Sequence, residues 1–270
     1  MKRFFLITLS LLTAWACTRT GVPAPGGFQA VMEEMEPDTR SNVSDAGHFV
    51  WNDWDQVAVY TSADRFSYFN LASGAGTNKA YFVGSLAEDE SVQDLAVYPS
   101  YGHVREGSTL NILYPDTYNY PADTTDSCPV MIAKLAGGTA DFKHIGGLMR
   151  IRYKNVPVNA THLVLTFPNQ VVSGSFPVNL DDEEPTAEMR SGSSQVCINF
   201  TPPTEPSNTR HFYLPLPCGT LTDMTLEFRD ANDAFIPGTQ FISHSDKTVT
   251  RKRLLKMPGL VLTVINAGIE

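Results

Sequence analysis

The sequence predicts an all-β protein built from two tandem β-sandwich domains. Apolar residues recur with a period of two in many short segments, and turn residues separate nearly all of these segments. No long apolar pattern with helical spacing follows the first seventeen residues. The chain has 19 Gly and 18 Pro among its 270 residues, a composition that suits many short strands joined by turns.

The first seventeen residues predict export and a lipid anchor. A basic start at Lys2 and Arg3 precedes an apolar run that ends at Ala16 and is shorter than the roughly 20 residues that a membrane-spanning helix needs. The Ala16-Cys17 junction resembles the lipobox of bacterial lipoproteins, in which the cysteine becomes the acylated first residue. We expect a lipoprotein signal peptide over residues 1–16 and a lipid on Cys17. The alternative is an ordinary leader cut near Ala16, with Cys17 as a free thiol.

Residues 17–46 are predicted to form a tether. Pro and Gly residues are frequent at its start, and an acidic run follows over residues 33–38. Within the tether, Phe28 to Met35 is predicted to form one short strand or a helical turn. Folded sequence is expected to begin at about Gly47.

Two later segments carry the clearest strand pattern. Apolar and polar residues alternate over residues 149–154 and 224–229, as one buried and one solvated face require. The turn residues 230–233 follow the second segment and residues 235–236 restart it, which predicts a hairpin. Further predicted strands are Gln56 to Tyr60, Lys79 to Val83, Ser91 to Tyr98, Thr109 to Tyr114, His162 to Phe167, Ser175 to Leu180, Val196 to Phe200, Arg210 to Pro215, Thr248 to Leu255 and Leu260 to Ile265.

A small, uncharged segment, Leu135 to Thr139, predicts the boundary between the two domains. We therefore expect an N-terminal β-sandwich over residues 47–136 and a C-terminal one over residues 137–270. Each has the ordinary size of a sandwich domain.

The charge of the chain argues against nucleic acid as a partner. Twenty basic and 29 acidic residues give a net charge of −9, and loss of Lys2 and Arg3 with the leader gives 18 against 29, or −11. Phosphate backbones require clusters of Lys and Arg.

Three cysteines remain if Cys17 carries a lipid. An oxidising envelope permits one disulfide among Cys128, Cys197 and Cys218, and unpaired thiols are the open alternative. None of these cysteines has the short spacing that clamps zinc, so no metal site is predicted.

Two other constellations have competing interpretations. Trp51 and Trp54 beside Asp53 and Asp55 have the composition of a sugar-binding platform, but a core or strand-edge role for Trp51 and a partly exposed Trp54 are favoured. The acidic run 181–184 lacks the spacing of a calcium loop, which favours a solvated turn. Since no catalytic motif is present either, the sequence predicts no enzyme and no cofactor.

The order of several short segments is distinctive. Thr39-Arg40 precedes Phe49 to Tyr60, as in the "TR … W-x-x-G-D-x-I-x-V-Y" opening of the Bacteroidetes fimbrillin-like proteins, the subunits of type V pili. Over nearly its whole length, the chain resembles this family, although Trp54 replaces the usual Gly. The other matching segments are Ala96 to Ser100, Tyr114 to Tyr118, Pro129 to Ala133, Phe142 to Ile151, Gly174 to Phe176, Phe212 to Pro217 and Val249 to Lys252.

The resemblance implies a fold and a mode of assembly. Such pilins have two transthyretin-like β-sandwich domains and reach the outer membrane as lipoproteins. A trypsin-like protease then cuts behind an Arg, the first strand leaves, and a strand of the next subunit fills the groove. In this sequence the cut would fall between Arg40 and Ser41, with a solvated linker arginine as the alternative interpretation. The strand removed would lie near Phe28 to Met35.

Two functions follow from these predictions. The first is a fimbrial subunit or fimbria-associated adhesion lipoprotein at the cell surface. Its partners would be other fimbrial subunits, the outer membrane through the lipid, and a surface ligand. The second is a non-polymerising surface lipoprotein of the same fold that binds glycan or protein.

Overall fold

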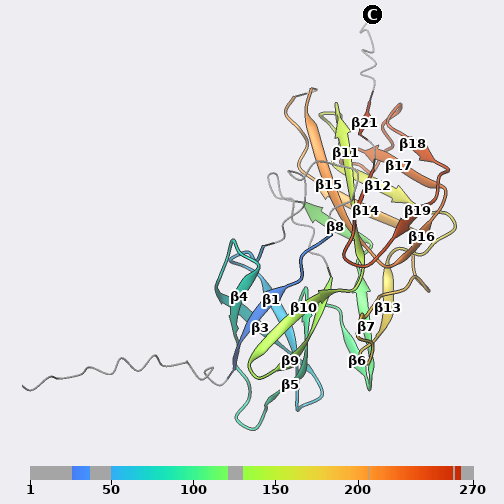
Figure 1. Ribbon diagram of the computed structural model, residues 1–270. Helices are drawn as coiled ribbons and strands as arrows, with labels where there is room; N and C mark the ends of the chain where they lie inside the picture. Colours follow the sequence, from blue (N-terminus) through green and yellow to red (C-terminus); the bar gives the residue numbers. More distant parts are fainter. Residues whose placement is uncertain (1–25, 37–49, 121–129, 206, 258, 263–270) are drawn as a thin grey trace, which may run out of the picture.

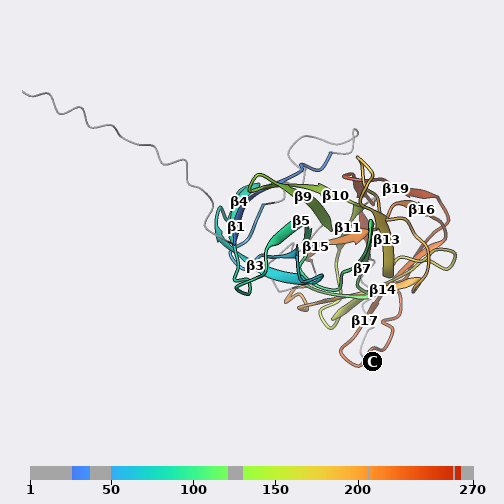
Figure 2. The ribbon, with the colours of Figure 1, turned by 90° about the horizontal axis from the view of Figure 1, so that it is seen from below.

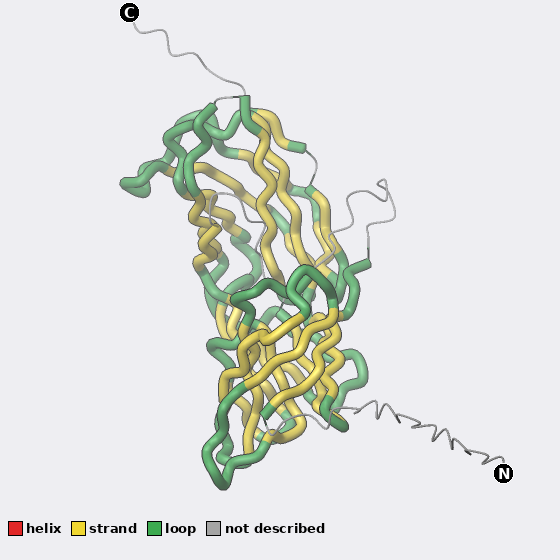
Figure 3. Tube along the Cα trace, turned by 90° about the vertical axis from the view of Figure 1, so that its left-hand side faces the viewer, coloured by secondary structure: helices red, strands yellow, loops and turns green. Residues whose placement is uncertain are grey.

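The computed structural model describes residues 26–36, 50–120, 130–205, 207–257 and 259–262. All regular structure in these ranges is β-strand, which confirms the all-β class. No helix long and apolar enough to cross a membrane occurs in them. The strands gather into two bodies that follow one another along the long axis of the molecule (Figure 1, Figure 3).

The lower body in Figure 1 is a closed barrel. Its strands follow in the order β1-β10-β9-β5-β2-β3-β4, and β4 pairs with β1 again. Figure 2, which views the molecule from below, shows the barrel strands around a ring. They are β1 (Gly27–Met32), β2 (Gln56–Thr61), β3 (Phe66–Ser73), β4 (Lys79–Val83), β5 (Val92–Tyr98), β9 (Met131–Ala136) and β10 (Thr139–His144).

Strand β5 shows how a period of two builds the core. Ala96 and Tyr98 belong to the cluster inside the barrel, whereas Leu95 and Val97 pack on its outside against a second sheet. That sheet has the order β13-β7-β6. Its strands are β6 (Val104–Glu106), β7 (Thr109–Tyr114) and β13 (Gly174–Asn179). The end of β5 is therefore buried on both faces.

The upper body is a sandwich of two sheets around the largest hydrophobic cluster. One sheet has the order β15-β11-β20 with β21 also on β11, and the other has the order β18-β17-β12-β14-β8. A short pair, β16-β19, lies beside them. These strands are β8 (Thr117–Tyr120), β11 (Gly147–Lys154), β12 (His162–Thr166), β14 (Gln195–Phe200), β15 (Thr209–Leu216), β16 (Gly219–Leu221), β17 (Met224–Arg229), β18 (Phe241–Ser243), β19 (Lys247–Val249), β20 (Leu254–Lys256) and β21 (Leu260–Val261).

Most predicted strands are present, and β4 and β7 have the predicted bounds. Folded sequence begins earlier than the predicted Gly47, because β1 starts at Gly27 and completes the barrel. The single strand predicted from Thr248 to Leu255 is wrong. It is divided into β19 and β20 by a turn in which Lys252 has a φ of 52°.

The predicted hairpin after β17 forms, but the connection to its second strand is longer than predicted. Asp230 accepts hydrogen bonds from the backbone N–H groups of Asn232 and Ala234, so the turn at residues 230–233 is confirmed. Only an isolated bridge joins Arg229 to Phe235. The return strand is β18, which pairs with β17 from Phe241 onward.

The segment predicted as a domain boundary is a tight hairpin turn. Ala136 pairs with Thr139 across Gly137 and Gly138, whose φ angles are 58° and 80°. Glycine is suited to these two positive angles. The predicted boundary at residues 136–137 therefore lies inside a hairpin whose two strands, β9 and β10, both belong to the barrel.

Candidate functional site

The first strand of the described chain occupies a slot between two strands from later in the sequence. Strand β1 pairs antiparallel with β4, from Gly27 opposite Val83 to Val31 opposite Lys79. On its other side it pairs in parallel with β10, from Gln29 opposite Thr139 to Met32 opposite Phe142. Backbone hydrogen bonds on both sides hold β1, and it closes the barrel.

Side chains of β1 fill the barrel at every second position. Phe28, Ala30 and Met32 are buried, with exposed fractions of 2%, 0% and 4%. The ring of Phe28 lies 5.7 Å from that of Phe69 and 5.9 Å from that of Phe82. Such aromatic contacts add to the burial of apolar area. The prediction of a short strand near Phe28 to Met35 is confirmed over Gly27–Met32.

A glycine at the start of β1 permits close approach of the neighbouring strand. A Cβ atom added to Gly27 would lie 2.3 Å from the hydroxyl oxygen of Tyr81 on β4. Any larger residue would require the side chain of Tyr81 to move away from β1 at this point.

A short segment after β1 continues the attachment to the barrel. We call residues Glu33–Glu36 the strap. The backbone N–H of Glu33 donates to the carbonyl of Phe142 (2.9 Å), and the carbonyl of Glu33 accepts from Nε2 of His144 (2.9 Å). Burial is the main cause that lowers the pKa of His144, to about 4. His144 is therefore neutral near pH 7 and donates this hydrogen bond as the Nε2–H tautomer.

The two tryptophans near the start of β2 occupy contrasting environments. Trp51 is fully buried, and its ring makes edge contacts with Phe82 (5.0 Å), Tyr98 (5.2 Å) and Phe142 (5.4 Å). Trp51 forms part of the barrel core, to which the buried side chains of β1 also belong. Trp54 is 70% exposed. This placement agrees with the interpretation of Trp51 as a core residue rather than half of a sugar platform.

The acidic run 181–184 is a turn whose side chains contact their neighbours. Asp182 accepts a hydrogen bond from the side-chain amide of Asn179 (2.8 Å), and Glu184 pairs with Arg251 and with Lys143. Within the described residues, no group of three or more His, Cys, Asp or Glu side chains is placed to hold a metal ion.

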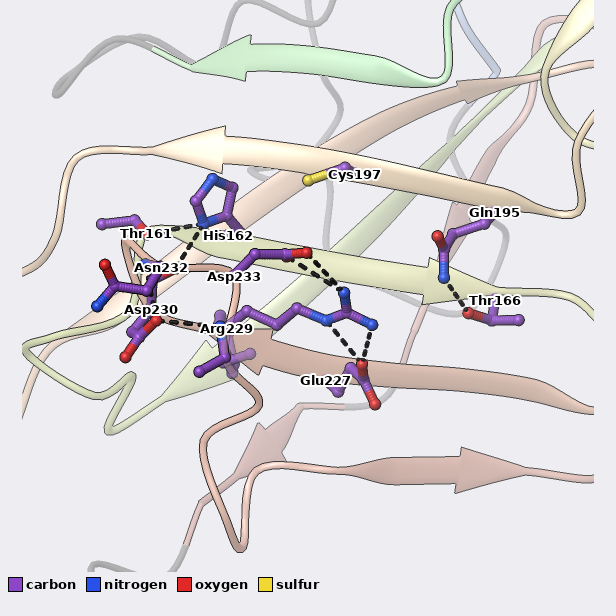
Figure 4. Close-up of polar contacts among 12 residues, drawn as sticks. Thr161, His162, Thr166, Gln195, Cys197, Glu227, Arg229, Asp230, Asn232 and Asp233 are labelled. Carbon is purple, nitrogen blue, oxygen red and sulfur yellow. Dashed lines mark hydrogen bonds and ion pairs between the residues drawn. The ribbon is translucent and has the colours of Figure 1, made fainter.

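The outer face of the β17 sheet carries a second group of charges, drawn in Figure 4. The guanidinium of Arg229 lies between Glu227 (2.6 Å) and Asp233 (3.2 Å) and pairs with both. Asp233 belongs to the turn at residues 230–233, which these contacts fix to the strand. The hydrogen bond from Arg229 to Glu227 is the main cause that raises the pKa of Arg229.

Two of the cysteines carry free thiols. Cys197 lies on β14, on the face drawn in Figure 4, and Cys218 lies just before β16. Burial raises the pKa of both thiols, that of Cys218 to about 11. Thiols with a raised pKa are poor nucleophiles. Cys128 lies outside the described residues.

Three predicted site residues also lie outside the described residues. They are Cys17, the predicted lipid attachment site, and Arg40 and Ser41, the predicted cleavage site. In the sequence, Cys17 precedes β1, and Arg40-Ser41 lies between β1 and β2.

The overall fold of this chain is similar to that of a known structure. A candidate cell adhesion protein from Bacteroides ovatus superposes with a TM-score of 0.50 and 14% identity, over 90% of this chain and 95% of that one. This chain has the fold of that protein. This likeness is one of fold alone, and it agrees with the predicted resemblance to that extent.

Two further structures superpose less closely. A candidate cell adhesion protein from Bacteroides thetaiotaomicron gives a TM-score of 0.38 at 12% identity, over 89% of this chain and 93% of that one. The fimbrial anchor protein Mfa2 from Porphyromonas gingivalis gives 0.26 at 14% identity, over 82% of each chain. No protein-family model matches the sequence, and no curated protein matches it.

Proposed function

We propose that this protein is a fimbria-associated adhesion subunit of the bacterial cell surface, in which β1 is a removable strand. The observation that carries the proposal is the position of β1, which is hydrogen-bonded on both sides and fills the barrel with three buried side chains. The fold shared with the Bacteroides ovatus protein supports the adhesion role. Its mechanism is interaction between subunits, without catalysis.

The proposed trigger is a cut between Arg40 and Ser41, which breaks the polypeptide between β1 and β2. The cut does not by itself empty the slot. Burial of Phe28 and of Met32 contributes about 1.5–3 kcal/mol each, and hydrogen bonds to β4 and β10 remain. We therefore expect β1 to leave only when a strand from another subunit replaces it and restores the same hydrogen bonds.

The predicted lipid takes on a defined role in this scheme. Cys17 and β1 lie on the same side of the cut, so a lipid on Cys17 would stay with β1. Exchange of β1 would then release the body from the membrane and join it to a neighbouring subunit in one step. The lipid would serve as a temporary anchor of the precursor.

The test is limited tryptic cleavage of the purified chain, followed by electrophoresis without boiling. We expect a ladder of SDS-resistant oligomers after a cut behind Arg40, because strand exchange buries a complete strand. Arg40→Gln should block both the cut and the ladder. Arg19→Gln is the matched control, since a cut behind Arg19 leaves β1 attached to the barrel.

Monomer alone after a verified cut behind Arg40 would exclude self-polymerisation and favour the non-polymerising binding protein. Mass spectrometry of the protein from the native envelope gives an independent measurement. A mature chain that starts at Ser41 supports release, and one that starts at acylated Cys17 supports a retained anchor.

A further inference from the structure

The strap joins the two bodies of the molecule. Its first residue, Glu33, is hydrogen-bonded to the barrel at Phe142, and its last residue, Glu36, donates its backbone N–H to the carbonyl of Lys252 (2.7 Å). Glu36 also forms a parallel bridge with Arg253. Residues 250–253 connect β19 to β20, and we call them the basic loop. In Figure 1 the blue segment after β1 leaves the lower body and rises toward the upper one.

Three successive cations of the basic loop contact two carboxylates of the strap. Arg251 Nη1 lies 2.7 Å from Glu33 Oε2, which also accepts the backbone N–H of His144 (3.0 Å). Lys252 Nζ lies 3.0 Å from Glu36 Oε1 and 3.8 Å from Glu33 Oε1. Arg253 Nε lies 3.4 Å from Glu36 Oε2. Charge-assisted contacts of this kind are stronger than neutral hydrogen bonds.

The backbone fixes the basic loop in this position. Lys252 donates its N–H to the carbonyl of Gly146 (2.9 Å), and the carbonyl of Arg253 accepts from Leu148 (3.0 Å). A Cβ atom on Gly147 would lie 2.7 Å from the carbonyl oxygen of Thr250, so the loop lies directly on the backbone where β11 begins. The backbone that carries the cations is therefore held by β11 as well as by the strap.

The ion pair between Arg251 and Glu33 is the most buried contact between the basic loop and the strap. The side chains of Arg251 and Glu33 are 11% and 21% exposed. Arg251 has a second carboxylate partner, Glu184. Among the described residues, the ion pairs of Lys252 and Arg253 are with the strap alone. Departure of the strap would leave the partly buried Arg251 with Glu184 alone and would remove the carboxylate partners of Lys252 and Arg253, an unfavourable arrangement.

We infer that the basic loop is a docking site for an acidic peptide segment. The groups it binds are the side-chain carboxylates of the residues one and four positions after the strand that occupies the β1 slot. In the intact chain Glu33 and Glu36 occupy these positions after Met32. The partner is a second chain whose inserted strand carries Asp or Glu at the same two positions. The identity of this partner rests on the proposed function, since that function supplies the strand exchange.

The first experiment uses the intact chain and is independent of strand exchange. Hydrogen exchange is measured at the amides of β1 in Glu33→Gln, in Arg251→Gln and in the double variant. We expect each single change to speed exchange about tenfold, and the double variant to be no faster than either single one. Glu34→Gln is the matched control, because Glu34 is exposed and should change exchange less than twofold. Additive effects, or a Glu33 variant that behaves like the Glu34 variant, would overturn the docking site.

The second experiment tests the partner. A labelled peptide of residues 27–36 is added to chain cut behind Arg40, beside the same peptide with Glu33→Gln and Glu36→Gln. We expect about tenfold less capture of the second peptide and a smaller difference at 1 M salt. Equal capture would overturn selection of an incoming strand by the basic loop. Capture of neither peptide, with coupling seen in the first experiment, would refute the removable strand while supporting the carboxylate site.

Discussion

The first and last strands of the described chain occupy different places in their sheets. Strand β1 has a neighbour on each side, β4 and β10, and closes the barrel. At the other end of the chain, β20 and β21 both pair in parallel with β11 alone. Each of these terminal strands runs parallel to an inner strand, but only β1 lies between two neighbours.

Burial follows the same division. Three of the six residues of β1 are buried, whereas β21 has a half-buried Leu260 and a 66% exposed Val261. The strand nearest the predicted cleavage site, β1, is thus the strand that closes its sheet. Removal of β1 would expose two strand edges, and removal of β21 would expose one. This difference favours the N-terminal strand as the element of exchange.

The largest expected effect comes from emptying the β1 slot of its main side chain. Phe28→Ala should lower the free energy of unfolding by about 3–5 kcal/mol, because it leaves a cavity beside Phe69 and Phe82. Val261→Ala on β21 should change it by less than about 0.5 kcal/mol. Urea denaturation followed by tryptophan fluorescence measures both values. A loss below about 1 kcal/mol in Phe28→Ala would contradict the central role of β1.

Sequence patterns predicted the strands whose two faces differ in burial. Strands β4 and β7 alternate between buried and more exposed residues, and both were predicted with their exact bounds in the structure. Strand β3 has one buried residue, Phe69, so its sequence carries no clear period. The sequence indicates the strand near Phe28 only weakly, because Ala30 is a small residue. Only the pairing with strands distant in the sequence shows that Ala30 lies inside a barrel.

The contacts between the strap and the basic loop could not be predicted from the sequence. Glu33 and Arg251 are 218 residues apart, and no sequence pattern links the two positions. The predicted continuous strand from Thr248 to Leu255 would also have pointed Arg251 and Lys252 to opposite faces. The turn at Lys252, with its positive φ, places both cations toward the strap. Long-range pairing of this kind depends on the fold as a whole.

Acid should loosen the first strand more than the last. His144 holds the backbone after β1, whereas the side-chain amide of Asn155, which does not titrate, holds the carbonyl of Leu262 after β21 (3.0 Å). Because the pKa of His144 falls from 6.5 to about 4 on folding, the unfolded chain binds an extra proton between these values. Stability is therefore lost as the pH falls from 6.5 to 4, by about 3 kcal/mol at most.

Two measurements check this effect of acid. After correction for the intrinsic amide exchange rate, which itself falls with pH, the protection of β1 against hydrogen exchange should decrease from pH 6.5 to 4, while the protection of β21 changes less. In His144→Gln, whose amide can still donate to the Glu33 carbonyl, the loss of stability between pH 6.5 and 4 should be smaller by about 3 kcal/mol. An unchanged pH dependence in this variant would show that other groups cause the acid sensitivity.

The smallest expected effects compare two glycines, one beneath the basic loop and one just before β21. Gly147→Ala should cost about 1–3 kcal/mol, since its Cβ would lie 2.7 Å from the Thr250 carbonyl oxygen and would displace the loop. Gly259→Ala meets no atom closer than 4.0 Å and should stabilise the chain by about 0.4–1 kcal/mol through the unfolded state. Thermal unfolding measures both. If Gly147→Ala also left exchange at β1 unchanged, the basic loop would not hold the strap, because displacement of the loop must weaken the pairs made by Arg251 and Lys252.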